Sequence, residues 1–184
     1  MSSCSVSLKG NLFVKFEPFP WEKMSLNANP IELYDDKAGA SDATYRANNP
    51  DEKSLDCYEP EKAESGCPRC DYLLVHRAAS GRTVRFIELK GGDSPPRRGE
   101  KLCAQGCQQT WAHAFHQLFA TYESCAGCID GDDDVGMILC TSWDKNHKKP
   151  YAKYKQYRYY KAIRNIERFD IVPQVMYRDC VDSI

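Results

Sequence analysis

The clearest hydrophobic pattern lies near the middle of the chain. The stretches DYLLVHRA and TVRFIELKG are rich in apolar residues and flank the sequence ASGR, whose Gly81 suits a tight turn. This pattern predicts a β-hairpin that begins at Asp71 and ends at Glu88, Leu89 and Lys90. Antiparallel pairing would bring the two ends of the hairpin together.

A helix and two further strands are predicted after the hairpin. Within CAQGCQQTWAHAFHQLFATYES, apolar side chains form a single helical stripe at Trp111, Phe115, Leu118, Phe119 and Tyr122. VGMILCTSW is typical of a buried strand, and FDIVPQVMY of a last strand that Pro173 confines to a sheet edge. A strand that leads through a helix to a neighbouring strand predicts a right-handed parallel crossover.

These elements predict an α/β fold with a mixed sheet flanked by helices. A chain of 184 residues is most simply one domain, here residues 1–184, with its core at about 67–142. The basic, tyrosine-rich segment 144–168 is expected to be partly helical. Near the start, NLFVKFEPF is typical of a strand interrupted by proline. Residues 27–64 show weak periodicity, which suits loops or a single helix.

Composition and charge narrow the class of protein. The net charge is -1, and no apolar run approaches the length that spans a membrane. The start, MSSCSVSLKG, lacks the apolar core of a signal peptide. We therefore expect a cytoplasmic protein with no membrane partner.

The hairpin carries charged side chains where a buried strand would have apolar ones. Side chains alternate between the faces of a strand, so Glu88 and Lys90 share a face with Phe86. Burying these charges is costly unless each has a partner or a bound ion. Two carboxylates, Asp71 and Glu88, would repel each other unless a divalent cation lay between them. Their hard oxygen ligands suit Mg²⁺, which activates water for attack on phosphate.

The order Asp71, then Glu88-Leu89-Lys90, resembles the PD-(D/E)XK nuclease superfamily, whose restriction-endonuclease-like core is a mixed sheet flanked by helices. CDYLL, ELKG and the later A-x-x-Q-L are similar to a group of small bacterial and phage proteins. The resemblance implies that Asp71, Glu88 and the Leu89 carbonyl bind Mg²⁺ or Mn²⁺. It also implies that Lys90 positions the attacking water and that Gln117 lines the site. The candidate catalytic residues are therefore Asp71, Glu88, Lys90 and Gln117.

Three pairs of cysteines have spacings that suit a zinc site: Cys67 and Cys70, Cys103 and Cys107, and Cys125 and Cys128. The first pair is expected at the active end of the sheet, and the third at the far end of the helix, roughly 22 to 28 Å away. The first two pairs are therefore the predicted zinc ligands. Plain buried thiols are the alternative.

Segment 144–168 combines basic residues with tyrosines and holds few acids. Basic side chains neutralise phosphates, and tyrosine rings stack on exposed bases. Together with two arginines of the loop before the helix, the segment supplies the predicted nucleic-acid contacts: Arg97, Arg98, Lys148, Lys149, Lys153, Lys155, Arg158 and Lys161.

The sequence thus predicts a metal-dependent endonuclease that hydrolyses phosphodiester bonds of DNA, with RNA as the second choice. Nucleases of this type often cut as dimers, so a homodimer is an open expectation. An E-x-K sequence at a strand end is often only a solvated ion pair, which leaves two alternatives. One is an inactive nucleic-acid-binding or interaction module with the same fold. The other is a zinc-stabilised structural protein.

Overall fold

The computed structural model describes residues 19–34, 43–63, 68–78, 81–90, 106–142, 171, 173–177 and 180–184, with the backbone alone at 78 and 106–113. In chain order the elements are β1 (Lys23–Leu26), β2 (Ile31–Tyr34), β3 (Thr44–Asn48), β4 (Leu55–Tyr58), the 3-10 turn η1 (Pro60–Lys62), β5 (Tyr72–Ala78), β6 (Gly81–Lys90), α1 (Gly106–Cys125), the 3-10 turn η2 (Ala126–Cys128), β7 (Asp134–Thr141), β8 (Gln174–Met176) and β9 (Asp182–Ser183).

The larger sheet has six strands in the order β1-β4-β5-β6-β7-β8. β1, β4, β5 and β6 pair antiparallel in turn, whereas β6, β7 and β8 run parallel, which confirms the predicted mixed sheet. The predicted hairpin is β5 and β6, which pair from Tyr72 opposite Ile87 to Ala78 opposite Gly81. Gly81 has a φ of 137°, a conformation that residues with a side chain rarely adopt.

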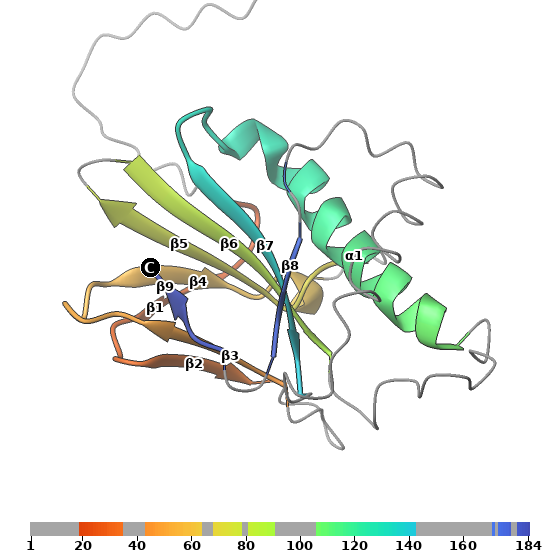
Figure 1. The fold of residues 1–184 in the computed structure, drawn as a ribbon. Coiled ribbons are helices and arrows are strands. Elements are labelled where there is room, and N and C mark those ends of the chain that lie inside the picture. The colour runs from red at the N-terminus through yellow and green to blue at the C-terminus, as the bar shows by residue number, and fades with distance from the viewer. Residues whose placement is uncertain are drawn as a thin grey trace, which may run out of the picture.

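Helix α1 lies across one face of this sheet (Figure 1). Phe115, Leu118 and Phe119 of the predicted helical stripe are buried in one cluster with Phe86 of β6, whereas the Trp111 side chain lies outside the described residues. The strands before and after the helix, β6 and β7, are parallel neighbours, as predicted. β8 follows Pro173 and is the last strand of the sheet, which confirms the predicted edge position.

A second sheet covers the opposite face of the first. Its order is β2-β3-β9, with β2 antiparallel and β9 parallel to β3 (Figure 1). Leu33 of β2 and Tyr45 of β3 pack with Ile87 and Leu89, whose side chains leave β6 on the face away from Phe86. Apolar residues from both sheets therefore form a second core.

The prediction of loops or one helix for residues 27–64 is wrong, because strands β2, β3 and β4 lie there. β2 and β3 show the alternation of a half-buried strand, with Ile31 and Leu33 buried on one and Tyr45 and Ala47 on the other. Each alternating run is only four or five residues long and is surrounded by polar residues. A pattern this short does not stand out from the sequence around it.

The protein is thus α/β-like and mostly sheet, with a helix on one face of the mixed sheet and a smaller sheet on the other. The predicted strand at the start of the chain lies outside the described residues except for Phe19, and segment 144–168 lies outside them entirely. Among the described helices, none combines the length and apolar character needed to cross a bilayer.

Candidate functional site

The predicted site residues of the hairpin meet at one end of the six-stranded sheet. Asp71 directly precedes β5, and Glu88, Leu89 and Lys90 end β6. Because Tyr72 pairs with Ile87, the register places Asp71 beside the end of β6. The backbone N–H of Leu89 donates a hydrogen bond of 2.6 Å to Asp71 Oδ2. The hairpin therefore fixes the position of this carboxylate relative to Glu88.

Glu88 is the most deeply placed charge of the site. Its exposed fraction is 0%, and it shares the α1 side of β6 with Phe86. Oε1 is ion-paired with Lys90 Nζ, whereas Oε2 has neither a hydrogen-bond nor an ion-pair partner among the described residues. A buried carboxylate oxygen without a partner is costly, and a bound cation is one way to satisfy it.

Burial and like charge act together on the carboxyl groups. Burial, followed by a hydrogen bond to the carboxyl group of Glu61, raises the pKa of Asp71 to about 7. Burial, followed by the charge of Asp71, raises the pKa of Glu88 well above its usual range, although Lys90 opposes this. Negative charge at this end of the sheet is therefore costly at neutral pH.

Glu61 is a site residue that the sequence analysis did not identify. It lies on η1, in the connection from β4 to β5, and its side chain is exposed. β4 and β5 are antiparallel, with Tyr58 opposite Leu73, so this connection lies at the same end of the sheet as Asp71. Recognising β4 as a strand would have placed Glu61 near the site.

Gln117 approaches the site from α1 through the segment that precedes Asp71. Its side chain is 5% exposed, and Nε2 donates a hydrogen bond of 2.8 Å to the carbonyl oxygen of Arg69. Oε1 is buried and has no hydrogen-bond partner within the described ranges. The structure thus links Gln117 to the backbone that carries Asp71, and leaves its amide oxygen available as an acceptor.

The residues present fit a divalent cation. Asp71 and Glu88 offer carboxylate oxygens, and Glu88 Oε2 and Gln117 Oε1 are buried acceptors without a partner in the described part of the chain. Hard oxygen donors of this kind are the ligands of Mg²⁺ and Mn²⁺. The ammonium of Lys90 lies beside them, with its side chain 25% exposed.

The cysteine pairs are arranged differently from the prediction. The backbone N–H of Cys70 donates to Thr121 Oγ1 at 2.8 Å, and Cys70 and Cys125 are buried in one hydrophobic cluster. The prediction that the first and third pairs lie a helix length apart is therefore wrong. The C-terminal half of α1, rather than its start, lies over the end of β5 next to Asp71.

Cys70 is a buried thiol. Its Sγ donates a hydrogen bond of 3.3 Å to the carbonyl oxygen of Tyr72, and burial raises its pKa well above the usual value. Cys67, Cys103 and the side chain of Cys107 lie outside the described residues, so the zinc site stays a prediction.

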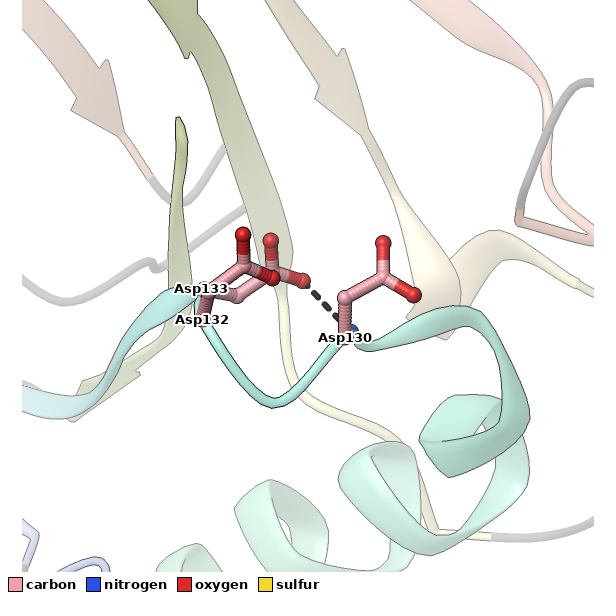
Figure 2. Close-up of side chains that lie close together, drawn as sticks. All are labelled: Asp130, Asp132 and Asp133. Carbon is pink, nitrogen blue, oxygen red and sulfur yellow. Dashed lines mark hydrogen bonds between the residues drawn. The ribbon is translucent and has the colours of Figure 1, made fainter. Parts of the chain in front are cut away.

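A separate acidic cluster precedes β7. The carboxylates of Asp130, Asp132 and Asp133 lie within 4.8 Å of one another and point to the same side of their loop (Figure 2). Arg82 is bonded to two of them, through Nε to Asp133 Oδ1 at 2.9 Å and through Nη2 to Asp130 Oδ2 at 3.0 Å. Because the guanidinium pairs two of the three carboxylates, we assign the cluster a structural role.

The predicted nucleic-acid contacts, Arg97, Arg98, Lys148, Lys149, Lys153, Lys155, Arg158 and Lys161, lie outside the described residues. Comparison with protein-family models, curated protein sequences and solved structures finds no match for the chain. Function must therefore be argued from the site itself.

Proposed function

We propose that the protein is a metal-dependent nuclease that hydrolyses phosphodiester bonds of DNA. The observation that carries this proposal is the buried Glu88, whose Oε2 has no partner among the described residues, at the sheet end that also holds Asp71 and Lys90. A protein that buries an incompletely paired carboxylate beside a second one has a site suited to a divalent cation.

The proposed core is restriction-endonuclease-like. The connectivity supports this, because an antiparallel hairpin with the acidic residues at its open end is followed by a helix and a parallel strand. One difference from the expected core is that a three-stranded sheet, instead of helices, covers the second face within the described part of the chain.

In this proposal Asp71, Glu88 and the main-chain carbonyl of Leu89 hold Mg²⁺ or Mn²⁺. When bound, such an ion acidifies water and stabilises negative charge on a phosphoryl group. Lys90 orients the attacking water, because its partly exposed ammonium lies on the strand face that carries Glu88. The water oxygen bonds to phosphorus as the bond to the leaving oxygen breaks. The water gives up a proton, and the leaving oxygen gains one.

Gln117 has a positioning role in this mechanism. Its amide donates to the Arg69 carbonyl, two residues before Asp71, and so fixes the backbone that leads into the site. DNA is the proposed substrate, and RNA the second choice, because the sequence of segment 144–168 combines basic side chains with tyrosines.

Cleavage assays test the proposal. Purified protein is incubated with plasmid DNA, single-stranded DNA and RNA, in Mg²⁺, in Mn²⁺ and in EDTA. We expect cleavage of DNA only with a divalent ion, and loss of at least about 100-fold in rate for Asp71→Ala and Lys90→Ala. Asp134→Ala, at the opposite end of the sheet, is the matched control and should cleave normally.

A second candidate function is a nucleic-acid-binding module without catalytic activity. The ion pair between Lys90 and Glu88 favours it, because the ammonium already neutralises much of the buried charge without a metal. Binding of DNA by the wild-type protein, with no cleavage in either Mg²⁺ or Mn²⁺, would decide for the module and against the nuclease.

A further inference from the structure

We propose that Glu61 is a third carboxylate ligand of the divalent cation that Asp71 and Glu88 hold. This inference rests on the proposed function and extends it to a residue outside the hairpin. The geometry that carries it is the position of Glu61 on η1, in the β4–β5 connection at the sheet end that holds Asp71, together with Oε2 of the fully buried Glu88, which has no partner among the described residues.

The position of Glu61 follows from a well-anchored turn. Pro60 is buried at the start of η1, and the backbone N–H of Ala63 donates to its carbonyl oxygen at 3.2 Å. Glu59, two residues before Glu61, is ion-paired with Lys62 at 2.7 Å in the same turn. The turn therefore directs one acid to a surface lysine and the next acid to Asp71.

Carboxylates that lie near one another repel, and a cation between them relieves the repulsion. Glu61 acts in this way on both other acids, because it contributes to the raised pKa of Asp71 and of Glu88. In the other acidic cluster, by contrast, the Arg82 guanidinium bonds Asp130 and Asp133 directly. A divalent ion between Asp71 and Glu61 would remove the repulsion between these two acids.

The three carboxylates also differ in burial in a way that suits ion entry. Glu88 is fully buried, Asp71 is half-buried and Glu61 is exposed. They form a series from the interior of the sheet to solvent. An ion that arrives from solvent would meet Glu61 first and would reach Glu88 Oε2 last, so Glu61 sets both affinity and access.

Isothermal titration calorimetry, in which Mn²⁺ is added to the metal-free full-length protein, tests this inference without depending on catalysis. Glu61→Gln keeps the size of the side chain and a hydrogen bond to Asp71 while it removes the charge. We expect its dissociation constant for Mn²⁺ to rise about 10- to 100-fold. Glu59→Gln, in the same turn, is the matched control and should stay within about 2-fold of wild type.

The outcomes separate the inference from the proposed function. If Asp71→Asn weakens Mn²⁺ binding while Glu61→Gln matches wild type, the role of Glu61 is overturned and the nuclease proposal stands. If the wild-type protein binds no Mn²⁺, both fall. Circular dichroism of each variant shows whether it is folded, and the exposed position 61 should tolerate Glu61→Gln.

Discussion

The side chains of the site are held in an environment that disfavours their charge. Asp71 accepts a hydrogen bond from Leu89 and is close to two further acids, Glu61 and Glu88, and the ammonium of Lys90 is ion-paired with Glu88. Burial adds to the repulsion. Such an arrangement lowers the stability of the metal-free fold, which is common where residues are selected for function.

Replacing Asp71 should therefore stabilise the metal-free protein in a pH-dependent way. Its pKa rises from 3.8 to about 7 on folding, so the folded state is penalised once the unfolded carboxyl group loses its proton. The penalty is absent below about pH 4, grows as the pH rises, and is complete above about pH 7. We expect Asp71→Asn to gain about 1–3 kcal/mol over wild type between pH 4 and pH 8 in EDTA, measured by urea unfolding.

The exposed Asp51 serves as a control, because its pKa is shifted in the opposite direction to that of Asp71. The hydrogen bond and the charge of Lys53 lower the pKa of Asp51, so its contribution to stability is present at neutral pH and is lost in acid. Asp51→Asn should gain nothing over wild type as the pH rises. A flat difference between Asp71→Asn and wild type across this range would contradict the burial argument.

Between elements, Arg82 at the start of β6 holds the connection from α1 to β7. Its guanidinium donates to Asp133 Oδ1 at 2.9 Å, to Asp130 Oδ2 at 3.0 Å and to the carbonyl oxygen of Cys128 at 2.8 Å. The Asp133 side chain is 3% exposed, and that of Arg82 is 14% exposed. These bonds tie the parallel crossover to the hairpin at the end of the sheet away from the candidate site.

Removing Arg82 should leave the buried carboxylate of Asp133 without its charged partner. We expect Arg82→Met to lower the free energy of unfolding by about 2–4 kcal/mol, measured by urea unfolding at neutral pH. Arg77→Met is the matched control, because the Arg77 side chain is 51% exposed and its contact with Asp56 is 3.5 Å long. The control should change stability by less than about 1 kcal/mol. If the two variants lose equal amounts of unfolding free energy, the bonds of Arg82 to the connection before β7 contribute no more to stability than an exposed ion pair does.

The elements that could be predicted from the sequence are those whose pattern is long and whose pairing is local. The hairpin joins neighbouring strands, and the stripe of α1 extends over several turns, so both were visible without tertiary information. The second sheet lacks both properties. β2 and β3 have four and five residues, and β3 takes β9, from the far end of the chain, as its parallel neighbour. No local pattern encodes that pairing.

The same distinction explains which parts of the candidate site could be predicted. Asp71 and Glu88 belong to one hairpin, so their proximity follows from its register. Glu61 depends on β4 being the antiparallel neighbour of β5, and β4 lies in the stretch that was expected to be loops or one helix. The position of Cys70 beside Thr121 depends on where α1 crosses the sheet, which periodicity does not specify.

For the molecule as a whole, a partly buried polar contact connects the two sheets. Arg85 of β6 reaches Asp182 of β9 at 3.5 Å, and the buried Tyr45 of β3 donates to Asp182 Oδ2 at 2.8 Å. Gly136 leaves room for this arginine, because a Cβ there would lie 2.9 Å from Arg85 Cδ. Asp182 thus joins three strands, although β9 itself has only two residues.

Truncating Asp182 should therefore weaken the attachment of the second sheet as a unit. We expect Asp182→Ala to lower the free energy of unfolding by about 2–3 kcal/mol, because the buried Tyr45 hydroxyl loses its acceptor and Arg85 loses a partner. Hydrogen exchange should also quicken in β3. Asp134→Ala removes another carboxylate bonded to Arg85, but one whose side chain is 67% exposed, so its cost should stay below about 1 kcal/mol. If Asp134→Ala lowers the free energy of unfolding more than Asp182→Ala does, Arg85 is held mainly by the exposed Asp134. Asp182 would then not connect the two sheets.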